Sequence, residues 1–398
     1  MPKYDLIIIG GGSAGLGVAK AASTENNKKI LLIDKDKLSS KTSNASLRII
    51  HGGLRYLQNL DIIRVCESLH AQDNLLKKYN DHIERLLCVM PLNKFGLKSK
   101  YPMICGSILY NIISFLITGK SNGAYVGKIK NYKNDIDIIK NKNTYALFWH
   151  DALLKSPLSF AETIKDELIK NNVEILENEK VLSIKKDKQD FIVETINNET
   201  INNKTRNNKT GNNEARNNKT KNNETSDTQE FSAKYVVNTT GPWLEEIKTS
   251  DNLKIYNKNY KWCKAFNIIL NKKANFKEAV GVFGEDNRAF FIVPRDGFIC
   301  VGTWYVPFSG DLENIAPSKD EVQAFMSSFN KVDLNVKITL DNIKELEAGI
   351  LPMKKVGKAG PVLYGLEKIS INDNYVRVLS TKYTTFLSQG KKVKKLIK

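Results

Sequence analysis

The chain of 398 residues is 41% hydrophobic and 26% charged, which is ordinary for a soluble globular protein and, at this length, allows two domains around a large core. Its formal net charge of +18 favours anionic substrates or an anionic membrane surface, although a Lys- and Asn-rich coding bias accounts for it equally well, and no motif indicates nucleic-acid binding. Five scattered cysteines without a CxxC pair, together with a first strand at residue 4, predict free thiols, no signal peptide and a cytoplasmic protein, with peripheral contact to the inner face of a membrane as an alternative.

Residues 4–34 form the first recognisable unit, which reads as strand, glycine turn, helix and strand. Gly10 permits a tight turn, Gly12 lets the backbone approach a pyrophosphate, and Gly15 allows the helix to pack closely on the strand. The helix N-terminus offers free N–H groups to phosphates, and Asp34 at the end of the second strand is placed to accept hydrogen bonds from a ribose. This combination predicts a dinucleotide site.

The next stretch contains a glycine pair and a very apolar window. Gly52 and Gly53 interrupt the helical pattern of residues 47–58 and allow the backbone to approach a flat group, and residues 62–79 again have helical spacing. The most hydrophobic window, Met103–Thr118, is shorter than the roughly 20 residues that cross a bilayer. It predicts a buried core helix, with a membrane-facing helix as the alternative.

The middle of the chain carries a tandem repeat between predicted strands. A helix at 159–170 precedes strands at 173–176, 180–185 and 191–195. Six copies of the pentapeptide xNN[KE][TA] then cover Ile196–Thr225. So hydrophilic a repeat cannot bury a core, and it predicts a disordered loop before the strand at 231–238. Alternating residues at 265–306 predict an antiparallel sheet, followed by a helix at 319–330 and by a strand, turn and helix start at 375–386.

Five segments carry a family resemblance: GGGSAGLG at 10–17, TSNASLRIIHGGLRYLQ at 42–58, VVNTTGPW at 236–243, FFIVPRDGFICVGTW at 290–304 and STKYTTF at 380–386. In this order they resemble the D-amino-acid oxidase superfamily of flavoproteins, and most closely the FAD-linked glycerol-3-phosphate dehydrogenases. The resemblance implies an α/β fold with a Rossmann-like, glutathione-reductase-like FAD-binding domain and an antiparallel-sheet substrate or cap domain. The FAD-binding domain would be discontinuous, comprising 1–90, 145–250 and 345–398, and the cap would comprise 91–144 and 251–344.

The resemblance also implies residues that would bind FAD. The ADP half would be held by Gly10, Gly12, Gly15 and Asp34, the adenine by Val181, and the pyrophosphate side by Thr240 and Gly241. The segment beside the ribityl chain and flavin would include Ser43, Ser46, Gly52 and Gly53. The last helix would start at Thr384 and Thr385, facing the flavin O2 edge.

Four further residues are candidates for the chemistry. Arg55 and Tyr56 match the family's substrate contacts, although a structural ion pair is the alternative for Arg55. Lys382 matches the active-site lysine, which would stabilise negative charge on a reduced flavin. His51 is a candidate base or, equally, a packed neutral histidine. The other histidines have no metal-ligand spacing, so we expect no metal.

The implied function is oxidation of a small anionic hydroxy compound by hydride transfer to flavin N5, with electrons passing to a quinone or oxygen. Alternatives are an oxidase or dehydrogenase of 2-hydroxy acids or amino acids, and a catalytically degenerate FAD-binding protein. Three departures from the family weaken the substrate assignment. Ser380 and Thr381 stand where the family has a glycine pair, Ile350 replaces an expected arginine, and the additional C-terminal helical domain of long members is expected to be missing.

Overall fold

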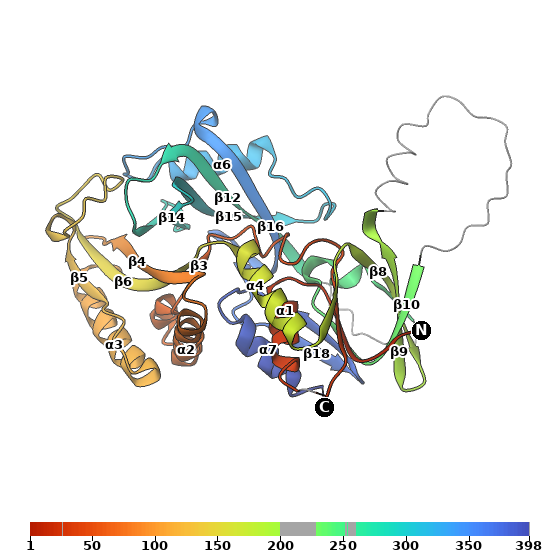
Figure 1. Cartoon of the computed structure of the whole chain (residues 1–398). Coiled ribbons are helices and arrows are strands. Elements are labelled where there is room, and N and C mark those ends of the chain that lie inside the picture. The colour runs from red at the N-terminus through yellow and green to blue at the C-terminus, as the bar shows by residue number, and fades with distance from the viewer. Residues whose placement is uncertain (26, 200–227, 251–252, 254–259, 398) are drawn as a thin grey trace, which may run out of the picture.

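The computed structural model describes residues 1–25, 27–199, 228–250, 253 and 260–397, and it contains two β-sheets with helices packed against them (Figure 1). The first sheet is centred on β1 (Lys3–Ile9), which lies parallel to β2 (Ile30–Ile33) and to β10 (Thr228–Asn238). The other strands of this sheet are β7 (Val173–Leu176), β8 (Glu179–Asp187), β9 (Asp190–Asn197), β11 (Lys248–Thr249), β18 (Lys368–Asn372) and β19 (Tyr375–Leu379). Every residue of β2 is buried, as expected for a parallel strand covered on both faces.

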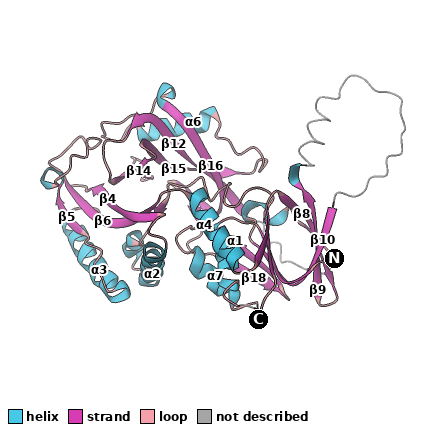
Figure 2. Ribbon diagram, viewed as in Figure 1, coloured by secondary structure: helices cyan, strands magenta, loops and turns pink. Residues whose placement is uncertain are grey.

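Three helices, α1 (Ser13–Ala22), α4 (Pro157–Lys170) and α7 (Phe386–Lys394), cover one face of this sheet through a shared apolar core (Figure 2). Helices α1 and α7 cross closely because both carry a glycine at the contact. A Cβ atom on Gly390 would lie 1.9 Å from the carbonyl oxygen of Gly17. The last helix is therefore seated directly on the helix that follows the glycine turn.

The second sheet is mostly antiparallel and has its own core. Its strands are β3 (Ile49–Ile50), β4 (Ile83–Pro91), β5 (Tyr125–Lys128), β6 (Tyr145–Leu154), β12 (Lys261–Lys273), β13 (Ala279–Phe283), β14 (Ala289–Arg295), β15 (Phe298–Phe308), β16 (Ile343–Gly357) and β17 (Gly360–Leu363). Helix α6 (Lys319–Phe329) packs Phe325 against Phe266 and Phe290 of the sheet. Helices α2 (Ile62–Lys78) and α3 (Lys100–Thr118) lie together beside β4, β5 and β6 (Figure 1).

The predicted fold class is confirmed by these two sheets. The division into domain ranges stays a prediction. Strand pairing places β3, β4, β6, β16 and β17 in the second sheet, although the predicted ranges put most of their residues with the FAD-binding part. The chain therefore passes between the two sheets more often than the predicted domain ranges imply.

The pentapeptide repeat lies almost wholly outside the described residues, since 200–227 are not among them. Its first two residues extend β9, where Ile196 pairs with Thr228 and Asn197 pairs with Glu179. The predicted loop thus begins later than expected, and its disorder remains a prediction.

The expectation of a buried helix at 103–118 was wrong. Among the described residues, α3 is the one helix long and apolar enough to span a membrane by length and composition, yet only 22% of its apolar window is buried. The physical reason is that the side facing the protein buries only Ser107, Tyr110, Ile113 and Ser114, so most of the apolar side chains point outward.

Candidate active site

A cavity of about 1610 Å³ lies where the two sheets meet. Four parallel strands of the first sheet end at it, because Gly10 follows β1, Asp34 follows β2, Thr239 follows β10 and Ser380 follows β19. The carboxyl edge of such a sheet is where α/β folds place their ligands. The predicted site residues that line this cavity are Gly10, Gly12, Asp34, Ser43, Ser46, His51, Gly53, Arg55, Tyr56, Val181, Thr240, Gly241, Lys382 and Thr384.

The glycine turn is shaped by β10 as well as by its own sequence. Gly10 has a φ of +96°, and a Cβ atom there would lie 2.9 Å from the backbone of Thr239. The Thr239 hydroxyl lies 2.8 Å from the carbonyl oxygen of Ile9 and 2.7 Å from that of Gly10, and so can donate to either. A Cβ atom on Gly15 would lie 1.8 Å from the carbonyl oxygen of Gly10, so Gly15 serves helix packing and does not line the cavity. Sequence reasoning missed Thr239.

Asp34 is a partly buried carboxyl group at the cavity wall. It accepts hydrogen bonds from the backbone N–H groups of Gly11 and of Asp36, the latter at 2.9 Å. Burial raises its pKa to about 6, although these hydrogen bonds act in the opposite direction.

The segment at 42–46 is tied to both sheets. The N–H of Ser13, at the start of α1, donates to the Ser43 hydroxyl at 3.0 Å. The N–H of Ile350 donates to the Thr42 hydroxyl at 3.1 Å. The two backbone segments can approach this closely because residue 349 is a glycine. Ser43 and Ser46 therefore lie on the cavity wall between α1 and β16.

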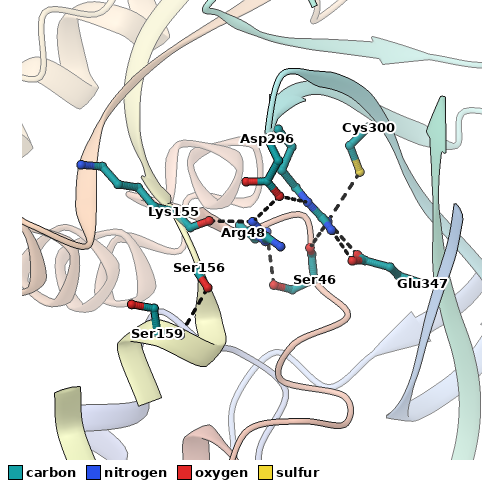
Figure 3. Close-up of polar contacts among 9 residues, drawn as sticks. Ser46, Arg48, Lys155, Ser156, Ser159, Asp296, Cys300 and Glu347 are labelled. Carbon is teal, nitrogen blue, oxygen red and sulfur yellow. Dashed lines mark hydrogen bonds and ion pairs between the residues drawn. The ribbon is translucent and has the colours of Figure 1, made fainter. Parts of the chain in front are cut away.

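A partly buried ionic cluster holds Ser46 from the other side (Figure 3). Arg295 at the end of β14 pairs with Glu347 of β16 and donates to the carbonyl oxygen of Ser46 at 3.3 Å. The backbone N–H of Arg48 donates to the Ser46 hydroxyl at 3.2 Å. The guanidinium of Arg48 forms an ion pair with Asp296 at 3.0 Å. The cluster spans some 250 residues of sequence, counted from Ser46 to Arg295, and sequence reasoning did not find it.

His51 is half-exposed in the cavity and is held by a buried carboxylate. Its Nδ1 atom lies 2.8 Å from Oδ2 of Asp151, whose other oxygen accepts the Gly52 N–H at 2.7 Å. Burial by itself would raise the pKa of Asp151, but the charge and hydrogen bond of His51 and the Gly52 N–H outweigh it and hold that pKa below its ordinary value. An ionised carboxylate accepts only, so in the neutral form of His51 the proton is on Nδ1 and Nε2 has the lone pair.

Gly52 has a different role from the predicted one. It does not line the cavity, and a Cβ atom there would lie 2.4 Å from the Tyr110 hydroxyl of α3 and 3.1 Å from the Gln72 side chain of α2. Its small size thus lets the two helices pack, while its N–H orients Asp151. Gly53 does line the cavity, with a φ of +90°.

Cationic side chains gather around Tyr56. The Lys382 ammonium lies 4.6 Å from the centre of the Tyr56 ring. Burial, with a smaller contribution from Arg55, lowers the pKa of Lys98, so Arg55 and Lys98 are close enough to repel each other. Arg55, Lys98 and Lys382 all line the cavity, and within the described part of the chain none forms an ion pair with a carboxylate. The structural ion pair considered for Arg55 is thus absent among those residues.

Strand β16 shows which of its side chains faces the cavity. Leu346 and Ala348 pack on the core beneath α6, and Ile350 shares their face because side chains alternate along a strand. Its neighbour across the sheet, Lys264, pairs with Glu321 of α6. Leu351 lies on the opposite face with Gly349 and faces the cavity. Ile350 also borders the cavity, but its side chain is only 2% exposed, so the expectation that position 350 contacts a ligand stays a prediction.

The remaining predicted residues are distributed as follows. Thr385 precedes α7 and is buried outside the cavity, whereas Thr384 lines it. Val181 lies at an irregularity of β8, and Thr240 precedes the short 3₁₀ helix Gly241–Glu245. Their individual contacts to a ligand stay predictions.

Comparison with known proteins decides the family. The model of the family described as FAD-dependent oxidoreductase, DAO, matches residues 5–92 and 131–367. The chain belongs to the DAO family of FAD-dependent oxidoreductases. Its cofactor is FAD.

Curated relatives of this DAO-family chain are phosphorylated-polyol dehydrogenases by name. Glycerol-3-phosphate dehydrogenase of Synechocystis sp. is 25% identical, with 98% of this chain and 69% of the relative covered. D-erythritol 1-phosphate dehydrogenase of Brucella abortus is 25% identical over 90% of this chain and 65% of its own. Aerobic glycerol-3-phosphate dehydrogenase of Staphylococcus saprophyticus is 24% identical over 88% and 58%. The chain thus spans less than two thirds of several relatives.

Solved structures share the fold. Glycerol-3-phosphate dehydrogenase from Bacillus halodurans, complexed with FAD, superposes with a TM-score of 0.68 at 16% identity, covering 99% of this chain and 64% of that one. L-alpha-glycerophosphate oxidase from Mycoplasma pneumoniae, with FAD bound, has a TM-score of 0.69 at 14% identity, covering 100% and 95%.

The cavity of this DAO-family member fits FAD on its own evidence. The hydroxyls of Ser40 and Thr381 are buried at its wall without a hydrogen-bond partner among the described residues. A Cβ atom on Gly12 would lie 3.3 Å from the Ser43 hydroxyl, which is a tight contact at the cavity wall. Unsatisfied polar atoms and a side-chain-free N-terminus of α1 suit a long polar ligand with phosphates.

The raised pKa of Asp34 predicts a pH dependence of FAD binding. A ribose hydroxyl donates to the ionised carboxylate, so a proton on Asp34 competes with the ribose. Because the pKa of Asp34 is about 6, the affinity for FAD should be constant above that pH and fall below it, by up to about tenfold per pH unit. Fluorescence titration of the apoprotein with FAD at several pH values measures this. Asp34→Asn should bind more weakly with a flat profile, and a flat wild-type profile would contradict the assignment.

Proposed function

We propose that the protein oxidises a small phosphorylated polyol or a similar anionic hydroxy compound and passes the electrons to a quinone or oxygen. The observation that carries this is the group of Arg55, Lys98 and Lys382, three cavity cations that form no direct ion pair with a carboxylate among the described residues, although the charge of Asp61 acts on Lys382 at longer range. Unpaired cations in a partly buried cavity favour an anionic ligand. The relatives named for glycerol 3-phosphate and D-erythritol 1-phosphate support the same substrate class.

FAD supplies the hydride acceptor, at flavin N5. The chain's own residues would do the rest. Arg55 and Lys98 would hold the anionic group of the substrate, and Arg55 can do so with a bidentate fork. His51 would take the hydroxyl proton at Nε2 while Asp151 holds its Nδ1–H, which is the arrangement of an oriented general base. Lys382 would add positive charge beside the flavin, where negative charge develops.

Anaerobic mixing of the FAD-loaded protein with a panel of reductants tests the proposal. Glycerol 3-phosphate and D-erythritol 1-phosphate should bleach the flavin, and glycerol and erythritol should do so far less well, since they lack the anion. Bleaching by 2-hydroxy acids or amino acids alone would favour the corresponding oxidases. Bleaching by dithionite but by no organic compound would indicate a degenerate FAD-binding protein.

Arg55 and Lys382 should differ in the kinetic constant that they affect. Arg55→Ala should raise the substrate concentration for half-maximal flavin reduction by roughly tenfold or more, since it removes a charge-assisted contact present before and during the reaction. Lys382→Met should chiefly lower the limiting rate. Stopped-flow reduction separates the two effects, and Lys391→Met on the exposed side of α7 serves as the control. Unchanged constants in both variants would remove these residues from the site.

A further inference from the structure

Helix α3 buries few of its large apolar side chains and exposes most of them. Its apolar side points outward and consists of Tyr101, Ile108, Leu109, Ile112, Phe115 and Leu116, all exposed. Its buried side consists of Ser107, Tyr110, Ile113 and Ser114, of which only Ile113 is aliphatic. A helix on a protein surface ordinarily turns its apolar stripe to the core and its polar side to water.

The orientation of α3 is fixed by specific polar contacts. The side chain of Asn111 brackets the backbone of Ala124, accepting its N–H at 2.9 Å and donating to its carbonyl oxygen at 2.8 Å. The hydroxyl of Ser114 donates to the carbonyl oxygen of Lys120 at 2.9 Å. Tyr110 packs against Gly52, where no larger residue fits. Rotating the apolar side inward would break these contacts, so its exposure is built into the fold.

The surroundings of α3 are basic. Residues 92–120 contain Lys94, Lys98, Lys100 and Lys120 and no aspartate or glutamate. Phe95 and Leu97, in the loop that leads into the helix, are also exposed. Figure 1 shows α3 at the periphery of the molecule, beside α2 and below β5 and β6.

The other side of α3 borders the active-site cavity. Met103, Gly106 and Ser107 line that cavity together with Leu97 and Lys98 of the preceding loop. A partner bound to the outer side of α3 would therefore be separated from the active-site cavity only by the width of this helix.

We propose that the apolar side of α3 docks on an anionic lipid bilayer, with the helix lying in the plane of the interface. Apolar side chains at the centre and lysines near both ends match the acyl and headgroup layers of such a surface. A second copy of the chain would bring two basic surfaces together, which charge repulsion opposes. The polar contacts that hold α3 to β5 and its flanking loops also argue against insertion across the bilayer. This inference goes beyond the proposed function and does not depend on it.

Co-sedimentation of the full-length, FAD-loaded protein with vesicles tests the proposal. We expect binding to vesicles of phosphatidylcholine mixed with phosphatidylglycerol, weaker binding to phosphatidylcholine alone, and reduction of binding by salt. The double variant Ile112→Glu/Leu116→Glu should lower partitioning by roughly tenfold or more, since it removes two apolar side chains and adds two negative charges. Both residues are exposed, so the variant should fold and keep its flavin. Ile371→Glu, an exposed apolar position on β18, is the matched control and should bind as wild type does.

Two results would overturn the proposal. One is wild-type protein that stays in the supernatant with both kinds of vesicle. The other is a lipid-free dimer in analytical ultracentrifugation that the double variant abolishes, which would assign the face to a second copy. Flavin bleaching by substrate is measured separately, so failure of docking and failure of the proposed function are distinguishable.

Discussion

Replacing His51 with Asn is expected to slow flavin reduction at saturating substrate by roughly a hundred- to ten-thousandfold, the range that a general base contributes. The substrate hydroxyl would then lose the lone pair at Nε2 that accepts its proton. Asp151→Asn should lose a large part of the same rate, because an amide no longer forces the proton onto Nδ1. The limiting rate of anaerobic stopped-flow reduction measures both effects.

The neighbouring histidine supplies the control for this experiment. His150 precedes Asp151 on β6, bonds the carbonyl oxygen of Asn122 at 2.9 Å and does not line the cavity. His150→Gln should therefore reduce its flavin at the wild-type rate. If His51→Asn keeps its flavin and also reduces at that rate, the proton is taken by another group.

Introducing arginine on β16 should have opposite consequences at two adjacent positions. Leu351→Arg would place a guanidinium on the face shared with Gly349 at the cavity wall. A charge-assisted hydrogen bond to a phosphate contributes roughly 1.5–3 kcal/mol, so glycerol 3-phosphate should bind about ten- to a hundredfold more tightly. Titration of flavin reduction against substrate concentration gives the change in affinity.

Ile350→Arg is the matched control for that variant. Ile350 is only 2% exposed and shares the face of Leu346 and Ala348 beneath α6. An arginine there would bury an unpaired charge, which should lower the free energy of unfolding by about 3 kcal/mol or more without tightening substrate binding. Denaturant unfolding monitored by flavin fluorescence tests this. Tighter binding by Ile350→Arg than by Leu351→Arg would show that the face assignment is wrong.

The parts of the site that could be predicted are those encoded within a short stretch. Gly10, Gly12, Gly15 and Asp34 lie inside one strand–helix–strand unit, so their spacing alone indicated a dinucleotide. His51 was a candidate because of its glycine-bracketed motif. Its partner Asp151 lies 100 residues away, and nothing near Asp151 in the sequence marks it as a carboxylate that orients a base. Arg295 and Glu347 were missed for the same reason.

The sequence by itself determined the strand–turn–helix unit, its dinucleotide ligand and the existence of an apolar helix at 103–118, because each depends on local composition and periodicity, whereas FAD in particular was implied by the family resemblance. Tertiary structure alone decided which face of a periodic element is buried. The pattern of α3 defines two sides, but the packing of Tyr110 on Gly52 and the contacts of Asn111 with Ala124 turn its apolar side outward. Likewise, register with β12 places Ile350 and Leu351 on opposite faces of β16, so that of these two cavity-bordering residues Leu351 is the more exposed. A one-residue shift reverses the face of a strand, and only pairing across the sheet supplies that register.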